Sequence, residues 1–232
     1  ANTPVWTSLM LGYDMTPLGS DGKLRTTSPE AIEAAALYKR LMTKAAPPGV
    51  TGFNWAEAQS AFLQGKIGMW FDGVGFAPPM ENPEKSRVVG KVGYGVMPKG
   101  PKAHAAGTFG DGIGVTSASA KKEAAYLFCQ WAVSPAMGAR LLQAGAGVPF
   151  RKSVLEDPKV REGVTMPPSW LDAVVGSGNI SRLALPVIIP VTGFRDIYGV
   201  ALTNRIAGAD PADELKKATE QFQPVLDRSE QG

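Results

Sequence analysis

The sequence predicts an α/β fold, in which helices pack against short buried strands. Two segments begin with side chains that cap helices, Ser28 and Asn54, and each continues with apolar residues at helical spacing. Residues 67–71 form a short apolar run, which is typical of a strand buried on both faces. Helices followed by a buried strand favour a layered architecture. The 27 glycines and 19 prolines indicate many short loops between short elements.

The first predicted helix begins after Ser28. A serine at the N-cap, Pro29 at the first helical position and Glu30 in the first turn all favour a helix start. The apolar face of this helix is formed by Ala31, Ala34, Ala35, Tyr38, Leu41 and Met42. We expect the helix to end before residues 47–49, because they read Pro-Pro-Gly.

The second predicted helix begins with a capping box formed by Asn54 and Glu57. Its shared apolar face is formed by Trp55, Ala58 and Phe62. Gly65 provides the C-terminal stop. The buried strand at 67–71 follows and ends in an Asp-Gly turn.

Two further strands are expected, at 92–97 and 112–116, and a helix follows at 121–133. The inward face of that helix is predicted to consist of Ala124, Ala125, Phe128, Trp131 and Ala132. The spacing of Trp131 from its apolar neighbours favours core packing over a binding role.

The C-terminal part is predicted to hold three helices. One begins at Ser134 and ends near Gly145, and the chain becomes loop-rich from the end of GVPFRKSVLEDP at residue 158 as far as residue 190. A helix is expected at 194–207 and another after the capping residue Asp210. The buried stripe of the last helix is formed by Leu215, Ala218, Phe222 and Leu226, and Pro224 is expected to end or kink it.

Composition disfavours several classes of function. The 24 basic and 21 acidic residues are scattered, so the net charge of +3 indicates a solvated surface and we predict no nucleic-acid partner. Cys129 is the only cysteine, so no internal disulfide can form, and its apolar neighbours favour a buried packing role. His104 lies in a polar loop without a nucleophile motif, which favours a surface position over a catalytic base. We expect no cofactor and no metal.

No apolar run approaches the ~18 residues that a membrane-spanning helix needs. The sequence does not open with a recognisable signal segment, so the cellular compartment cannot be inferred from such a segment.

Four sequence landmarks together resemble the carbohydrate-type extracellular solute-binding proteins that supply ATP-driven importers. The landmarks are SPEAIEA, AFLQGKIGMWFDG, GTFGDGIGVTSASAKKEAAYLFCQWAVSP, and the pair GVPFRKSVLEDP and ADPADELKKATEQF. They occur in the family order and span about residues 24–226. The resemblance implies a periplasmic-binding-protein type II-like fold, in which two α/β lobes joined by crossing segments close on a ligand.

The family chain is longer, and the resemblance implies that its N-terminal half is missing here. By the family pattern, residues 1–104 and 153–232 belong to the second lobe and residues 105–152 to the first. Strand 112–116 would then lack sheet partners, and the helices after it would lack a packing surface. We therefore expect a fragment whose 105–152 segment rearranges, associates non-natively with another copy, or is completed by something outside the sequence.

Sugar recognition needs flat apolar faces and planar polar groups. The resemblance places the ligand site at the end of strand 67–71 and in the turn after it, which favours Trp70, Asp72 and Gly73. The alternative is a core tryptophan followed by an aspartate that only caps the turn.

Two further places in the sequence supply candidates. Phe109, Gly110 and Asp111 lie where the chain enters the first lobe, and the glycines there let the backbone approach a ligand. A plain turn before a strand is the alternative. Arg151 matches the family pattern P-x-R, which implies a cleft or hinge role, while a structural ion pair is equally open.

Two aromatic positions complete the candidate site. Phe194 and Arg195 open the penultimate helix, where related proteins place a stacking aromatic residue, whereas the spacing of Tyr198 also suits the buried face. The resemblance places Trp6 near the start of a helix that lines the cleft.

The expected function is capture of a small polar solute, a mono- or oligosaccharide, without catalysis. Hinge closure would trap the solute for delivery to ABC permease subunits at the periplasmic or extracellular face of the bacterial membrane. A polyol- or glycerophosphodiester-binding protein of the same transport class is one alternative. A hydrolase using Asp72 and Asp111 as a carboxylate pair and a protein-interaction scaffold are two others.

Overall fold

The computed structural model describes residues 2–110, 112–148 and 151–229, which form two compact units. Unit 1 consists of Ala1–Trp70, Met97–Phe109 and Ser177–Gly232, and unit 2 consists of Phe71–Val96 and Gly110–Gly176. The chain passes from one unit to the other four times. These boundaries differ from those of the lobes predicted at 1–104 with 153–232 and at 105–152, and the lobe assignment stays a prediction.

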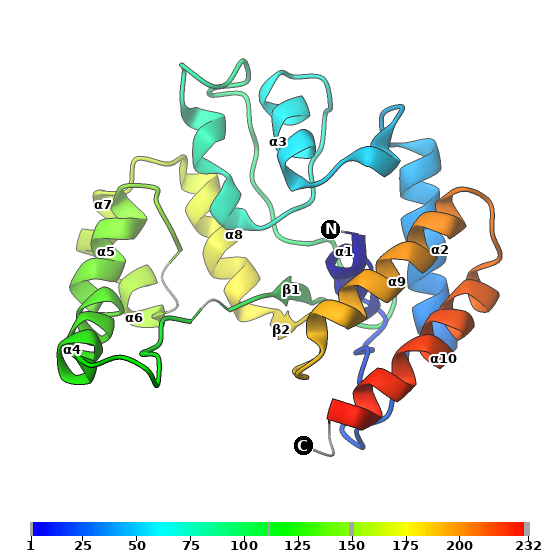
Figure 1. Cartoon of the computed structure of the whole chain (residues 1–232). Helices are drawn as coiled ribbons and strands as arrows, with labels where there is room; N and C mark the ends of the chain where they lie inside the picture. The colour runs from blue at the N-terminus through cyan, green and yellow to red at the C-terminus, as the bar shows by residue number, and fades with distance from the viewer. Residues whose placement is uncertain (1, 111, 149–150, 230–232) are drawn as a thin grey trace. The chain divides into compact units, whose positions relative to one another are not determined.

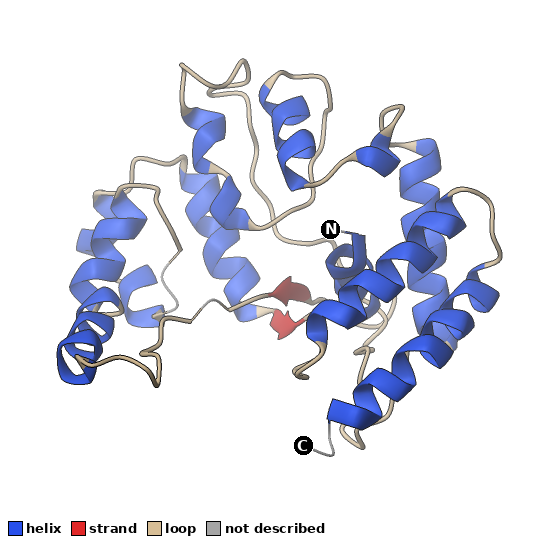
Figure 2. Ribbon diagram, viewed as in Figure 1, coloured by secondary structure: helices blue, strands red, loops and turns tan. Residues whose placement is uncertain are grey.

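The regular secondary structure of the described residues is predominantly helical (Figures 1 and 2). Unit 1 contains α1 (Asn2–Leu11), α2 (Pro29–Lys44), α3 (Trp55–Leu63), β1 (Ala106–Thr108), β2 (Ser181–Leu183), α9 (Val191–Ile206) and α10 (Pro211–Ser229). Unit 2 contains α4 (Lys122–Ala132), α5 (Pro135–Gln143), α6 (Lys152–Leu155), α7 (Pro158–Glu162) and most of α8 (Pro168–Asn179). Short 3-10 turns lie at Val50–Gly52, Val74–Phe76 and Pro78–Glu81.

The core of unit 1 lies between α1, α2, α9 and α10, and aromatic rings form its centre. The ring centroid of Tyr198 on α9 lies 5.6 Å from that of Trp6 on α1 and 6.2 Å from that of Phe222 on α10. All three side chains are fully buried. The indole Nε1 of Trp6 donates a hydrogen bond to the carbonyl of Ala31 on α2 at 3.0 Å, so this buried polar group is satisfied.

A ring of three hydroxyls links the segment before α2 to α9 and α10. The Tyr198 hydroxyl oxygen lies 2.7 Å from Oγ1 of Thr26 and 2.9 Å from Oγ1 of Thr219, and the two threonine oxygens are 2.8 Å apart. Oγ1 of Thr219 also donates to the carbonyl of Leu215 at 2.8 Å. Burial raises the pKa of Tyr198, so its hydroxyl keeps its proton at neutral pH.

Strands β1 and β2 lie side by side as a two-stranded parallel sheet (Figure 2). Ala106 pairs with Ser181, and the register continues to the end of both strands. Strand β1 lies against α1 at Gly107. A Cβ at this position would clash with the hydroxyl of Ser8 on α1. Glycine therefore lets the helix approach the strand closely.

A second close approach fixes the loop after residue 97 to the end of α1. The backbone N–H groups of Lys102 and Ala103 donate to the carbonyl of Gly12 at 3.0 and 3.1 Å. A Cβ on Gly100 would clash with the main chain of Gly12. The two glycines therefore allow the backbones to cross in contact.

Unit 2 has its own core around α8. Trp170 is 1% exposed, and its Nε1 donates to the carbonyl of Val74 at 3.0 Å. Leu142 of α5 and Leu171 of α8 pack in the same cluster. Tyr94 donates its hydroxyl to the Glu81 carboxylate at 2.8 Å, which ties two loop segments together.

The helix starts predicted from capping residues are confirmed. Oγ of Ser28 accepts an N–H in the first turn of α2, and Asn54 with Glu57 forms the capping box of α3. Ser134 and Asp210 cap α5 and α10 in the same way. Each cap joins a side chain to a backbone group no more than three residues away. The local sequence was therefore sufficient to predict where these helices begin.

One prediction in the C-terminal part was wrong. The region from residue 159 to 190 is not loop-rich throughout, because α8 occupies Pro168–Asn179 and most of α7 (Pro158–Glu162) also lies in it. A proline that reads as a break stands at the first position of α8, where it is compatible with a helix. The last helix continues past Pro224 to Ser229, so this proline does not end it, and the alternative of a kink at Pro224 stays a prediction.

The three predicted strands were wrong. Among the described residues, 67–71, 92–97 and 112–116 belong to no strand. Met69 is 71% exposed and Ile113 is 47% exposed, so the first and third runs are not buried. A strand forms only when it can pair with the edge of another strand. These three runs have the local sequence preference for a strand but no such partner in the described structure.

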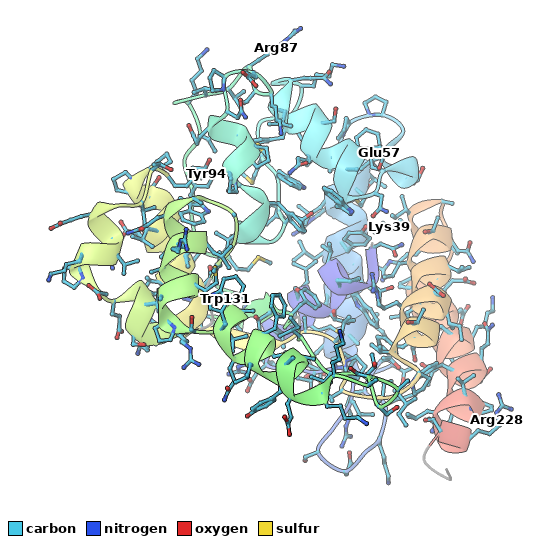
Figure 3. All side chains as sticks on the ribbon, turned by 60° about the vertical axis from the view of Figure 1, so that its left-hand side comes forward. Lys39, Glu57, Arg87, Tyr94, Trp131 and Arg228 are labelled. Atoms are coloured by element: carbon cyan, nitrogen blue, oxygen red, sulfur yellow. The ribbon has the colours of Figure 1, made fainter. Side chains whose placement is uncertain are left out.

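The predicted inward face of α4 is also wrong. Phe128 and Trp131 are 55% and 54% exposed, and their ring centroids lie 5.5 Å apart. Trp131 is labelled on α4 in Figure 3. Cys129 is half-buried rather than buried. The helical spacing was correct, but no part of the described structure covers this face.

Candidate functional site

The chain passes from unit 1 to unit 2 within the predicted ligand turn. Trp70, the last residue of this part of unit 1, is half-buried, and its ring centroid lies 6.3 Å from that of Phe62 on α3. Asp72 and Gly73, which lie in unit 2, are exposed. Packing on Phe62 supports the indole of Trp70 and leaves part of it in contact with solvent.

Only one of the two carboxylate oxygens of Asp72 accepts a hydrogen bond within the described structure. Its Oδ1 accepts the N–H of Gly73 at 2.7 Å, which is the turn-capping contact that the sequence left as an alternative. Within the described part of the chain, Oδ2 has no hydrogen-bond partner. Desolvation raises the pKa of Asp72, and the hydrogen bond from Gly73 opposes this more weakly. An unpartnered carboxylate oxygen can accept a hydrogen bond from a ligand hydroxyl.

The second group of candidates follows β1. Phe109 is 54% exposed, and Gly110 is exposed with no atom within 4 Å of the place a Cβ would take. Asp111 lies outside the described residues. Phe109 therefore presents an aromatic surface, and Gly110 leaves its backbone open to approach.

Arg151 makes a helix-bracing contact. Its Nε donates to the carbonyl of Val133, the C-cap of α4, at 2.9 Å. A cation at this place also interacts favourably with the negative end of the helix dipole. A cavity of about 90 Å³ lies beside it, lined by residues of α4, α5 and residues 147–148. Ligand pockets typically measure roughly 300–1,000 Å³, so this cavity cannot enclose a sugar by itself.

Trp6 and Phe194 are fully buried in the core of unit 1. The Phe194 ring centroid lies 4.5 Å from that of Tyr198, whose expected position on the buried face is confirmed. Neither Trp6 nor Phe194 has exposed surface with which to stack on a sugar. Arg195 is exposed near the start of α9 and keeps its side chain available to solvent.

Several exposed apolar side chains were missed from the sequence. Trp55, on the predicted apolar face of α3, is 45% exposed, and Phe76 and Met69 are 40% and 71% exposed. Phe76 follows the glycines of the Gly-Val-Gly-Phe run, and an aromatic residue in such a turn is a signal that could have indicated it.

The described residues contain no group of three or more His, Cys, Asp or Glu side chains that could hold a metal ion. His104 is exposed, and its ring Nε2 lies 2.8 Å from the carbonyl of Met97, so the expected surface position is confirmed.

Comparison with known proteins identifies the class. Residues 2–139, more than half of the chain, match the model of a family described as bacterial extracellular solute-binding protein. The chain belongs to this family. Its resemblance to solute-binding proteins of ABC transporters and the fold class of two-lobe periplasmic binding proteins are thereby confirmed.

Solved structures of this class match over nearly the whole chain, as two of them illustrate. An ABC transporter solute-binding protein from Agrobacterium radiobacter, solved with ribitol, has a TM-score of 0.82 and 29% identity over 95% of this chain and 55% of that chain. A maltose-bound protein of T. maritima has a TM-score of 0.82 and 23% identity over 95% and 56%. The chain thus spans about half the length of these structures.

Curated relatives agree with this class. A binding protein of Brucella abortus is 31% identical over 147 residues, which cover 62% of this chain and 34% of that protein. A protein of Sinorhizobium fredii, named as a probable amino-acid ABC transporter periplasmic-binding protein, is 30% identical over 75% of this chain and 39% of its own length. Within the described ranges, no helix is long and apolar enough to cross a membrane.

Proposed function

We propose that the protein captures a small polyhydroxylated solute, a sugar or a polyol, and delivers it to ABC permease subunits at the periplasmic or extracellular face of the membrane. The observation that carries this proposal is the match to the ribitol-bound protein, at 29% identity and a TM-score of 0.82 over 95% of the chain. The proposal concerns the whole protein, since this chain spans about half the length of that structure.

The chemistry of the candidate residues supports such a ligand. A polyol presents C–H surface, which aromatic rings bind, and hydroxyl groups, which both donate and accept hydrogen bonds. Trp70 and Phe109 offer ring surface, and Oδ2 of Asp72 offers an acceptor without a partner in the described structure. Arg195 offers guanidinium donors. We assign ligand contact to these four residues and propose no catalytic step for them.

The first experiment is native mass spectrometry of the full-length protein purified without denaturation. We expect a co-purifying neutral solute with the mass of a sugar or polyol. Isothermal titration calorimetry against sugars, polyols, glycerophosphodiesters and amino acids would then measure its affinity. Absence of binding across this whole panel would refute the proposal.

Two matched variants test the role of Asp72. Asp72→Asn keeps an oxygen for the N–H of Gly73 but removes the charge, and we expect affinity for a polyol to fall about tenfold or more. Asp157→Asn is the control, since Oδ1 of Asp157 likewise accepts a backbone N–H in unit 2, from Lys159 at 2.9 Å. Equal affinities of the two variants would remove Asp72 from the site.

An amino acid is the second candidate solute, because the Sinorhizobium fredii relative carries that name. An amino acid brings a carboxylate, which a guanidinium such as that of Arg195 binds strongly. Saturable binding of an amino acid and not of polyols would favour this candidate. In either case we expect no turnover of a chromogenic glycoside, and turnover that is lost in Asp72→Asn would instead indicate a hydrolase.

A further inference from the structure

Three Asp-Gly pairs occur in the sequence, at residues 21–22, 72–73 and 111–112. An aspartate before a glycine can close a five-membered ring with its own backbone, because glycine has no side chain to shield its amide nitrogen. The structure describes the first two pairs in full, whereas Asp111 lies outside the described residues. The two described pairs differ in how their reacting groups are held.

The reacting groups of Asp72 and Gly73 are in contact. The N–H of Gly73 donates to Oδ1 of Asp72 at 2.7 Å, and within the described structure this N–H has no other acceptor. Oδ1 is bonded to Cγ at about 1.2 Å, so the nitrogen lies within about 4 Å of that carbon. Well-oriented groups react from a separation of roughly 3–3.5 Å. Both residues are exposed, and among the described residues only the Gly73 N–H holds the carboxyl group, so a small side-chain rotation brings carbon and nitrogen together.

The pair Asp21 and Gly22 is held in the opposite way. The N–H of Gly22 donates to the carbonyl of Gly19 at 3.0 Å, so the nitrogen is engaged elsewhere. Oδ1 of Asp21 accepts the N–H of Lys23 at 3.2 Å, and Oδ2 accepts Nη2 of Arg25 at 2.8 Å. The N–H of Lys23 and the charge of Arg25 lower the pKa of Asp21, whereas desolvation raises the pKa of Asp72. A neutral carboxyl group loses water more readily than a carboxylate, so this difference acts in the same direction as the geometry.

We propose that Asp72 is a site of spontaneous covalent modification, at which the native turn promotes conversion of aspartate to isoaspartate. The nitrogen of Gly73 attacks Cγ of Asp72, and an N–Cγ bond forms. One Cγ–O bond breaks, and that oxygen leaves as water with the amide proton and the carboxyl proton. Water then opens the cyclic imide. Attack at Cγ restores aspartate, whereas attack at the main-chain carbonyl carbon of Asp72 breaks its bond to nitrogen and leaves an isoaspartyl link.

The product changes the backbone at a sensitive place. Isoaspartate keeps the negative charge but adds one methylene to the main chain, directly after the chain passes from unit 1 to unit 2. The carboxylate then projects from a different main-chain atom. The reaction itself goes beyond the proposed function and requires no solute, so it can be tested whether or not the protein binds a polyol.

The test ages the native 232-residue chain in neutral buffer and maps its peptides by liquid chromatography with mass spectrometry. An isoaspartyl peptide has the mass of its parent but elutes separately, and the cyclic imide is lighter by one water. Misplacing reacting groups by about 1 Å can slow a reaction about a hundredfold, so we expect Asp72 to react about tenfold or more faster than Asp21. In the chain unfolded in urea, the two residues should react at similar rates, because each precedes a glycine. Similar rates in the native chain would overturn the proposal, and so would a preference for Asp72 that persists in urea.

Substitutions test which atoms react. Gly73 has a φ of −62°, which alanine can adopt, and the nearest atom that its Cβ would meet is on the Phe76 ring at 3.3 Å. Gly73→Ala should therefore fold and slow the reaction severalfold, because the methyl group shields the nitrogen. An unchanged rate at Asp72 in this variant, with a native circular dichroism spectrum, would exclude attack by that nitrogen and overturn the proposal.

A matched pair of asparagine variants gives a second measurement. Asp72→Asn closes the same ring with loss of ammonia, which intact mass spectrometry detects as the ring opens to an acid. Asp21→Asn is the control, since the N–H of Gly22 stays bonded to Gly19. We expect Asp72→Asn to deamidate about tenfold or more faster than Asp21→Asn. Equal rates, or a faster reaction of Asp21→Asn, would overturn the proposal.

Discussion

In the variant Tyr198→Phe, the buried ring of three hydroxyls loses one member while the aromatic packing stays. The ring and the carbonyl of Leu215 make four short oxygen–oxygen contacts, but the three hydroxyls hold only three protons. Because Thr219 donates to Leu215, the Tyr198 hydroxyl takes part in at most two hydrogen bonds. Each buried hydrogen bond contributes about 0.5–1.5 kcal/mol, so we expect the variant to lower the free energy of unfolding by about 1–2 kcal/mol.

Tyr38→Phe is the matched control in the same core. Tyr38 is 7% exposed, and burial raises its pKa to about 12, but its hydroxyl has no hydrogen-bond partner among the described residues. Its removal should change the free energy of unfolding by less than about 0.5 kcal/mol. Urea titrations followed by far-UV circular dichroism measure both variants, and comparable slopes permit the comparison.

Two results would refute this account of unit 1. One is a destabilisation by Tyr198→Phe that equals that of Tyr38→Phe within about 0.5 kcal/mol. The other concerns the double variant Tyr198→Phe with Thr219→Val. The two side chains share a contact at 2.9 Å. The double variant should therefore lose less free energy of unfolding than the sum of the losses in the two single variants. Strict additivity would show that the hydroxyls act independently.

Three further predictions concern backbone contact, buried charge and acid sensitivity. Gly100→Ala should lower the free energy of unfolding in urea by about 1–3 kcal/mol, because its Cβ meets main chain, whereas Gly93→Ala, in open space, should not lower it. Arg205→Met should keep or raise the free energy of unfolding in a thermal melt, because within the described structure the Nε of this buried guanidinium is unpaired, and a loss of more than about 2 kcal/mol would contradict this. Lys102 holds the pKa of Glu30 below its ordinary 4.5, so this pair stabilises the fold above that pH and the contribution is lost as the pH falls through the lowered pKa. The urea midpoint should therefore fall less steeply below pH 4.5 in Lys102→Met, and parallel pH profiles would disprove the linkage.

Helix starts were predictable from the sequence because the chemistry that forms them is local. The Ser28 hydroxyl and the Asn54 amide bond to backbone groups within the next three residues, so the pattern alone identifies them. Strand pairing was not predictable in this way. Ala106 pairs with Ser181, and no pattern within either segment specifies that partner. The sheet therefore appeared where no strand was expected.

Only part of the candidate site could be predicted from the sequence, because burial and hydrogen bonding also depend on distant parts of the chain. Aromatic side chains serve both cores and sugar sites, so the sequence could not separate buried Phe194 from exposed Phe109. The unpartnered Oδ2 of Asp72 depends on the turn geometry and could not be inferred from residue type. For Trp131, the helical spacing was right, but burial depends on a covering surface that the described chain does not supply.

The contacts between the first and penultimate helices bear on how the polypeptide is made. Thr3 donates its hydroxyl to the carbonyl of Arg195 at 2.7 Å, and the Asn2 amide donates to the carbonyl of Gly199 at 2.8 Å. Ribosomes add roughly 5–20 residues per second, so α1 emerges on the order of 10–40 s before its partner. Helix α2 can cover part of α1 much earlier, because the Trp6 indole bonds Ala31 only 25 residues further along the chain. The stack of Trp6 on Tyr198, by contrast, can form only after most of this polypeptide has been made.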